Sequence, residues 1–213
     1  NKVLVEIEPF FKSKVEFVER LTDVDAYIAT GSDNSARYFE QYFAKKPNII
    51  RKNRTSIAVL SGDETKEELD NLTKDIFQYF GLGCRNVTFL MVPEKYDWEP
   101  FYEATLKWED VIHHSKYLNN YEYSRSVLLV KQVPHLDNGF LIVKQDDALN
   151  STISVLNYKF YTSDTEVEEL VSNQKEHIQC VVGKNYLPFG SAQTPNLWDY
   201  ADGVDTLEFL SNL

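Results

Sequence analysis

The sequence predicts an α/β fold built around a largely parallel β-sheet. Strand-like and helix-like segments alternate along most of its 213 residues, which is typical of parallel strands joined by helical crossovers. Hydrophobic residues make up 43% of the chain and aromatic residues 14%, so the chain can bury a sizeable core and is not disordered. This length suits one globular domain or two small ones.

Short apolar or alternating runs predict the strands. They are expected at VLVEIE (3–8), DAYIAT (25–30), SIAVLS (56–61), NVTFLMVP (86–93), GFLIVK (139–144), SVLNYKFY (154–161) and IQCVVG (178–183).

Apolar residues at helical spacing predict the helices between these strands. The clearest helix lies within residues 62–81, where one stripe is formed by Leu69, Leu72, Ile76 and Phe80, and Gly81 suits its C-cap. Further helices are expected after GSDN (31–34) and ending at Pro47, across 99–131 in two pieces, and over SDTEVEELVSNQ (163–174). The tail after residue 186 is expected to be mostly ordered loop, because it carries two prolines and two glycines.

Composition and charge exclude several kinds of partner. A formal net charge of −11 argues against nucleic acid, because phosphate binding needs clustered Lys and Arg. No apolar run approaches the length of a membrane span, and the first residues lack the order of a signal peptide, so a cytoplasmic protein is expected. The chain starts without Met and goes directly into a strand-like run, so we expect a fragment of a longer polypeptide.

The two cysteines and the histidines give no metal-binding pattern. Cys84 and Cys180 are almost a hundred residues apart, which gives neither a disulfide framework nor a zinc spacing. No pair of histidines has the helical separation of a metal site, so no metal is expected.

The first candidate site is the segment ATGSDNSA (29–36), where a strand runs into a Gly-Ser turn and then a helix. Backbone N–H groups at such a helix start, together with the Ser32 hydroxyl, form a site for a phosphate. The alternative is an ordinary N-cap in which Ser32 or Asp33 accepts from the first amides of the helix. No full G-x-G-x-x-G is present, and the local pattern alone favours the cap.

The second candidate is Cys84 in the segment FGLGCRN (80–86). A cysteine kept for packing normally sits among apolar neighbours, whereas Cys84 lies between two glycines and Arg85, whose charge favours the reactive thiolate. Gly81 and Gly83 allow backbone to approach a reacting carbon and to aim an amide at a developing oxyanion. The alternative is a small residue in a tight turn.

Other nucleophile and base candidates are weaker. Cys180 alternates within an apolar strand, which is typical of a core residue. His113 and His114 follow a predicted helix, and one of them could serve as base to a nucleophilic cysteine. The alternative is that both are surface or helix-end residues, because the sequence places no Asn or Asp to orient them.

Taken in order, three motifs resemble the aldehyde dehydrogenase superfamily, and most closely its acyl-CoA reductase branch, related to the bioluminescence-type long-chain fatty acyl-CoA reductases. ATGS (29–32) looks like the strand-turn motif that approaches the cofactor phosphates, which implies Thr30, Gly31 and Ser32 as cofactor-binding residues. FGLGCRN falls where the family places its nucleophilic cysteine. YLPFGSAQTP (186–195) is similar to a late Pro-Phe-Gly segment that lines the catalytic pocket, which implies Phe189.

The resemblance carries expectations about fold and domains. It implies a three-layer catalytic domain with a mostly parallel sheet, and a fragment lacking most of the nucleotide-binding domain. Residues 1–45 would end the cofactor-binding region, 46–185 would form the catalytic domain with the nucleophile, and 186–213 would be a pocket-lining tail. Family members commonly form dimers or tetramers, so a homo-oligomer is expected by analogy.

One departure from the family bears on the reaction. Aldehyde dehydrogenases carry a Glu-Leu-Gly-Gly-type segment whose glutamate activates water to hydrolyse the thioester, but here the stretch reads IIRKNRTSIAVL (49–60), without a carboxylate. A thioester intermediate without that base lives longer and can meet a thiol or a hydride. The basic residues Arg51, Lys52 and Arg54 could also attract the polyanionic CoA, or form only a solvated loop, and Arg85 is a further pocket candidate.

These features lead to the expected function. It is reduction of an acyl-CoA, expected to be long-chain, to an aldehyde with NAD(P)H through an acyl thioester on Cys84. Two alternatives stay open. One is a cofactor-independent cysteine acyltransferase or thioesterase with His113 or His114 as base, and the other is a non-catalytic interaction domain in which Cys84 is inert.

Overall fold

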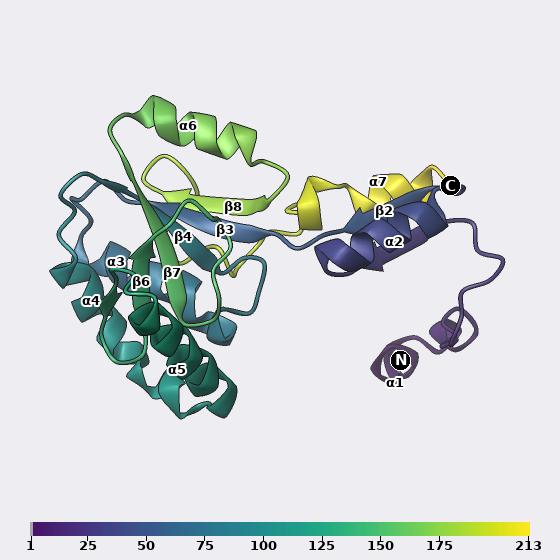
Figure 1. Ribbon diagram of the computed structural model, residues 1–213. Helices are drawn as coiled ribbons and strands as arrows, with labels where there is room; N and C mark the ends of the chain where they lie inside the picture. Colours follow the sequence, from purple (N-terminus) through teal and green to yellow (C-terminus); the bar gives the residue numbers. More distant parts are fainter. Residues whose placement is uncertain (1) are drawn as a thin grey trace.

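A computed structural model describes residues 2–213, the side chain of Asp33 excepted (Figure 1). Its main body is a six-stranded sheet in the order β5-β6-β7-β4-β3-β8, in which all neighbours are parallel except β5 with β6. The strands are β3 (Thr55–Val59), β4 (Val87–Pro93), β5 (Leu136–Asp137), β6 (Ile142–Gln145), β7 (Val155–Tyr161) and β8 (Ile178–Gly183). The predicted mostly parallel sheet is therefore confirmed.

Helices cover both faces of this sheet and complete three layers (Figure 1). One face carries α3 (Lys66–Phe77), α4 (Glu99–Thr105) and α5 (Ser115–Val130), with the 3₁₀ segments η2 (Gln78–Gly81) and η3 (Leu106–His113). The largest core cluster lies between them and the sheet, and it includes the fully buried Leu60, Leu72, Leu90 and Phe101. The other face carries α6 (Asp164–Asn173), which packs Val167 against Ile57 and Met91.

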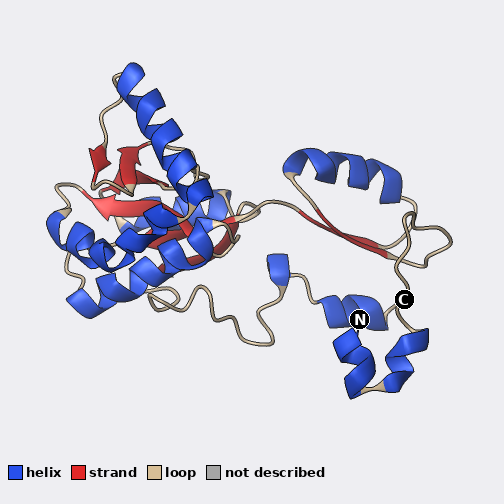
Figure 2. Ribbon diagram, turned by 90° about the horizontal axis from the view of Figure 1, so that it is seen from below, coloured by secondary structure: helices blue, strands red, loops and turns tan. Residues whose placement is uncertain are grey.

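A smaller unit lies beside the sheet (Figure 2). It is a two-stranded parallel sheet of β1 (Tyr27–Thr30) and β2 (Asn48–Arg51), connected by α2 (Asp33–Phe43). Residues 52–54 join β2 to β3, and the C-terminal segment with η4 (Ala201–Gly203) and α7 (Thr206–Ser211) returns to this junction. The domain boundary after residue 45 stays a proposal, and the pairing of β2 with β1 favours a position a few residues later.

The expected strand at residues 3–8 is wrong. Lys2–Ile7 forms the helix α1, followed by the 3₁₀ segment η1 (Pro9–Ser13), and none of these residues is buried. The alternating pattern predicts a strand only if a neighbouring strand supplies hydrogen bonds. No strand of the described residues lies beside this segment, so its amides bond locally, as Glu8 N–H does to the Leu4 carbonyl at 2.9 Å.

Two other local predictions need correction. The helix expected to reach a Gly81 cap ends at Phe77, and residues 78–81 form a separate 3₁₀ turn. The strand β2 lies where only a basic segment was expected. Among the described residues, no helix combines the length and the apolar character needed to cross a bilayer.

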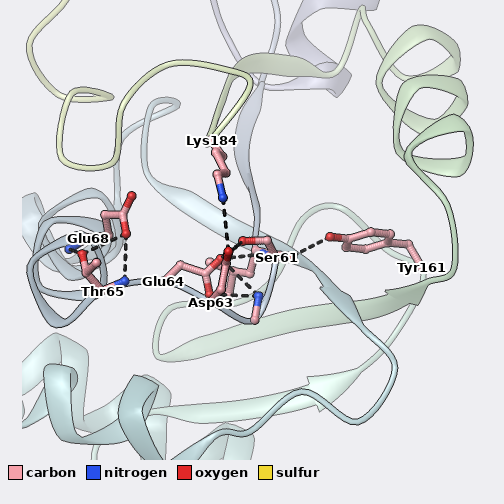
Figure 3. A network of polar contacts seen from close by, with 9 residues as sticks. Ser61, Asp63, Glu64, Thr65, Glu68, Tyr161 and Lys184 are labelled. Atoms are coloured by element: carbon pink, nitrogen blue, oxygen red, sulfur yellow. Dashed lines mark hydrogen bonds and ion pairs between the residues drawn. The ribbon is translucent and has the colours of Figure 1, made fainter.

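The carboxyl edge of the sheet carries a polar network that fixes the start of α3 (Figure 3). Thr65 and Glu68 form a reciprocal capping box, with the Glu68 carboxylate accepting from Thr65 N–H at 2.8 Å. Lys184 lies 3.2 Å from Asp63 and so connects the loops after β8 and β3. A hydrogen bond from Ser61 and the charge of Lys184 hold the pKa of Asp63 below its usual range. These hydrogen bonds and this ion pair position the start of α3 and join the two loops, so the network has a structural role.

Candidate active site

Cys84 lies at the amino edge of the sheet, next to the junction with the smaller unit. Because β3 and β4 are parallel neighbours, the turn before β4 and the junction before β3 lie at the same edge. The Ser56 hydroxyl at the start of β3 donates to the Cys84 carbonyl oxygen at 3.1 Å. The Cys84 side chain is exposed, as expected of a reactive thiol and unlike a core cysteine.

Residues 83–86 form the turn that carries Cys84, which we call the nucleophile turn because the sequence predicts Cys84 as a nucleophile. Two hydrogen bonds close this turn. Asn86 N–H donates to the Gly83 carbonyl at 2.9 Å, and Gly83 N–H donates to Asn86 Oδ1, also at 2.9 Å. The backbone N–H groups of Cys84 and Arg85 donate to no group within residues 2–213. The turn therefore presents an exposed sulfur beside amides that are available to an external acceptor.

Asn86 also fastens this turn to the end of α3. Its side chain is fully buried, and its Nδ2 lies 3.0, 3.1 and 2.8 Å from the carbonyl oxygens of Asp75, Ile76 and Gln78. A side-chain donor that satisfies helix-end carbonyls replaces the usual glycine cap, which explains why α3 ends before Gly81.

Asp75 fastens a second segment to the same helix end. Its buried carboxylate accepts from Gly190 N–H at 2.6 Å and from Ala192 N–H at 3.0 Å. Arg85 then donates to the Ala192 carbonyl at 3.0 Å. The Pro-Phe-Gly segment and the nucleophile turn are thus brought together across more than a hundred residues of sequence. Phe189 lies within this segment, partly buried against the main core.

Asp75 should make stability depend on pH. Burial raises the pKa of Asp75 to about 6, although the two N–H donors oppose the shift. Between pH 4 and 6 the native state then binds more protons than the unfolded state, so the free energy of unfolding falls as pH rises. A shift of about two pKa units corresponds to about 3 kcal/mol.

Urea unfolding of the wild type and of Asp75→Asn tests this dependence. The stability of the wild type relative to the variant should fall by about 3 kcal/mol between pH 3.5 and pH 7. Using the difference removes the contribution of the other carboxylates. A difference that stays constant with pH would contradict the role given to this carboxylate.

The Gly-Ser turn lies at the other side of the junction. Ser32 is the N-cap of α2, and its hydroxyl accepts from Ser35 N–H at 3.3 Å, so the cap interpretation is confirmed. Thr30, which precedes the turn, pairs with Arg51 in the two-stranded sheet. The five residues from Lys52 to Ser56 then span at most about 18 Å, and Ser56 contacts the Cys84 carbonyl. The turn and Cys84 therefore flank one junction. The exposed Ser32 at the N-terminus of α2 fits the phosphate of a nucleotide, and phosphate binding stays a proposal.

Gly31 is required for close packing of α2 on β1. A Cβ at this position would lie 2.8 Å from Ser35 Cβ and 3.0 Å from a ring carbon of Phe39. Gly31→Ala should destabilise the smaller unit by about 1–3 kcal/mol because α2 must move away. Hydrogen exchange of peptides from residues 25–51 measures the effect. Adding Ser35→Gly should restore part of the protection, and an unchanged exchange rate in Gly31→Ala would contradict this packing.

The basic residues before β3 contact the C-terminal segment. Arg51 Nη2 donates to the Thr206 hydroxyl at 3.1 Å, and its buried Nε has no partner among the described residues. Arg54 donates to the Ile178 carbonyl at 3.2 Å and lies 3.4 Å from Asp202. Both guanidinium groups are thus held at the junction, and Lys52 lies 2.7 Å from Glu40.

The remaining candidates, Cys180, His113 and His114, contact groups other than Cys84. Cys180 is partly buried, its sulfur lies 3.1 Å from Ser56 Oγ, and burial raises the pKa of its thiol. His113 is exposed beside Asp110 at 3.7 Å, whereas the His114 ring lies 4.3 Å from the Phe80 ring. In residues 2–213, no three side chains of metal-binding type gather into a cluster.

Sequence reasoning missed three residues that shape the site. Ser56, Asp75 and Asn86 are each 0% exposed and polar. Asp75 offered a signal, since it adds a charge close to the apolar stripe of the predicted helix. For Ser56 and Asn86 no sequence signal distinguishes an ordinary strand or turn residue from one that holds the nucleophile turn.

Comparison with known proteins gives matches only among solved structures. No family model matches the chain, and no curated protein matches it. An indole-3-acetaldehyde dehydrogenase in complex with NAD+ is 14% identical with a TM-score of 0.55, covering 70% of this chain and 38% of that chain. An NAD-dependent aldehyde dehydrogenase from Sinorhizobium meliloti is 12% identical with a TM-score of 0.53, covering 89% and 42%.

A salicylaldehyde dehydrogenase from Pseudomonas putida G7, complexed with salicylaldehyde, is 11% identical with a TM-score of 0.54, covering 78% of this chain and 41% of that chain. The chain thus spans about two fifths of the length of these structures. Identities this low bear on architecture and not on chemistry. Together with the three-layer arrangement and the parallel strand order, they show that the chain has the fold of the aldehyde dehydrogenases.

Proposed function

We propose that this chain carries the nucleophile of an acyl-CoA reductase that uses NAD(P)H. The observation that carries the proposal is the exposed Cys84 at the tip of a fastened turn, at the junction that also holds the Gly31–Ser32 turn. The fold of the aldehyde dehydrogenases supports an oxidoreductase that has an aldehyde as substrate or product. The acyl-CoA substrate is inferred from the resemblance of the three motifs and from the basic residues before β3.

The residues suggest the following steps. The Cys84 thiolate attacks the thioester carbonyl carbon, the new carbon–sulfur bond forms, and CoA leaves as its thiolate, which takes up a proton. The free amides of Cys84 and Arg85 stabilise the oxyanion of each tetrahedral intermediate. Thr30, Gly31 and Ser32 would hold NAD(P)H, which would supply the hydride that reduces the acyl carbon. The bond to Cys84 then breaks and releases the aldehyde.

The basic stretch before β3 supports reduction over hydrolysis. Its side chains at the junction are Arg51, Lys52 and Arg54, and none of them can remove a proton from water at neutral pH as a carboxylate does. The positive charge of the guanidinium groups suits the phosphates of CoA, and binding them directly would require Arg51 to leave Thr206 or Arg54 to leave Asp202. We retain a cytoplasmic location and a homo-oligomer as proposals only.

Intact-mass analysis after incubation with acyl-CoAs of graded length tests the proposal, and it is best done on the longest natural polypeptide that contains this chain. The mass should rise by that of one acyl group, and NAD(P)H should then remove it as the aldehyde. Cys180→Ser is the matched control and should still be labelled. Absence of labelling would favour a non-catalytic domain and would overturn the proposal.

One observation supports the alternative function, a cysteine acyltransferase or thioesterase that needs no cofactor. The His114 ring packs on Phe80, four residues before Cys84, so an imidazole lies near the nucleophile turn. A transferase or thioesterase would discharge the acyl group to water or to a thiol without NAD(P)H. His114→Gln should then slow discharge, whereas a reductase should keep its NAD(P)H-dependent release in this variant.

A further inference from the structure

A hollow without charged side chains in its lining borders the residues on either side of the nucleophile turn. It has a volume of about 240 Å³ and is bounded by η2, the start of β4, α5 and the loop before β7. Its lining includes Phe80, Leu82, Val87, Tyr117, Leu141 and Ile153.

The hollow borders the base of the turn that carries Cys84. Leu82 precedes the turn and Val87 follows it, and the two hydrogen bonds between Gly83 and Asn86 bring these residues together. Leu82 lies two positions before Cys84, a span of at most about 7 Å. A group attached to the sulfur can therefore reach the rim of the hollow.

The lining suits an uncharged, apolar ligand. Of the five hollows described in residues 2–213, this one alone has no charged side chain or histidine in its lining. Its polar side chains are already bonded within the chain: the Thr88 hydroxyl donates to the Leu149 carbonyl at 2.8 Å, and Tyr117 donates to the Phe140 carbonyl at 3.0 Å. Thr152 likewise pairs with Ser124 at 3.1 Å. A polar ligand would find few free partners there.

Other hollows are less suited to a chain attached to Cys84. The largest of the five has a volume of about 860 Å³, and its lining includes Trp98, His135 and Tyr158. Gln145 and Phe160 also line it, which places it at the carboxyl ends of β6 and β7. That is the edge of the sheet opposite the nucleophile turn. Its aromatic lining therefore does not make it an acyl site for Cys84.

We propose that the hollow bounded by Phe80, Leu82 and Ile153 binds the hydrocarbon chain of the acyl group while its carbonyl carbon is attached to Cys84. This rests on the proposed function, because it assumes an acyl thioester at that sulfur. Each methylene that enters the hollow should increase the acylation rate about fourfold. The rate should stop rising once the chain fills the space.

The test measures the second-order rate of Cys84 acylation by butanoyl-, octanoyl- and dodecanoyl-CoA, followed by intact mass. Ile153→Trp should fill the hollow and reduce the rates for the two longer chains to near that of butanoyl-CoA. Ile112→Trp is the matched control, because Ile112 is also a partly buried isoleucine against the same core but lies outside the hollow. It should keep the wild-type dependence on chain length.

Phe80→Ala provides a second test that does not depend on fitting a larger side chain. Removing this ring enlarges the hollow, so the longest chain should gain relative to octanoyl-CoA. Identical dependence on chain length in the wild type and both hollow variants would overturn the acyl site. In that case labelling at Cys84 would still stand, whereas no labelling by any acyl-CoA would instead refute the proposed function.

Discussion

Replacing Cys84 with alanine is expected to abolish acyl-enzyme formation and acyl-CoA-dependent oxidation of NAD(P)H. The variant lacks the atom proposed to form the thioester, and residues 2–213 offer no other exposed sulfur, because Cys180 is partly buried beside Ser56. Loss of a covalent nucleophile reduces turnover by a factor on the order of 10⁴ or more. The loss of NAD(P)H absorbance measures turnover, and intact mass measures acyl-enzyme formation.

The matched control for this result is Cys180→Ala. It removes the other thiol of the chain and leaves the nucleophile turn in place, so turnover should change less than about tenfold. Its thiol lies 3.1 Å from Ser56 Oγ, and the same hydroxyl holds the Cys84 carbonyl, so a small effect is expected. Undiminished turnover in Cys84→Ala, or loss in Cys180→Ala alone, would move the nucleophile away from Cys84.

The sequence predicted the sheet well because its strands are buried on both faces. SIAVLS, NVTFLMVP and IQCVVG became the neighbouring strands β3, β4 and β8, and each is a nearly continuous apolar run. The alternating pattern of residues 3–8 also predicts a strand, but Lys2–Ile7 forms a helix, because pairing with another strand is a property of the whole fold and not of the segment. Local pattern is thus reliable only where tertiary contacts support it.

The sequence singles out Cys84, the proposed reactive residue of the candidate site, but not the residues that support it. Cys84 stands out in the sequence because glycines and Arg85 flank it, and the structure shows that its side chain is exposed. The contact from Asp75 to Gly190 spans 115 residues, and nothing in either segment specifies the other. Likewise, the left-handed residues Tyr79 and Phe80 could not be expected from a helical stripe, since they follow from the helix end that Asn86 imposes.

Asn86→Ala is expected to cost about 3–5 kcal/mol in the free energy of unfolding, because several buried groups lose their partner at once. Three carbonyl oxygens at the end of α3 lose the donor Nδ2, and Gly83 N–H loses the acceptor Oδ1. Urea unfolding measures this loss. The freed turn should also lower the rate at which Cys84 reacts with acyl-CoA.

Asn120→Ala is the matched control, since Asn120 makes one hydrogen bond, from Nδ2 to the Lys116 carbonyl at 2.8 Å, on the surface of α5. It should change stability by at most about 0.5 kcal/mol. Asn86→Asp separates the two functions of the side chain, because a carboxylate still accepts from Gly83 N–H but repels the three carbonyl oxygens. If Asn86→Asp were as stable as the wild type, the helix-end contacts would carry little energy. Because one helix end holds both the nucleophile turn through Asn86 and the Pro-Phe-Gly segment through Asp75, that result would also remove the physical reason for their shared position.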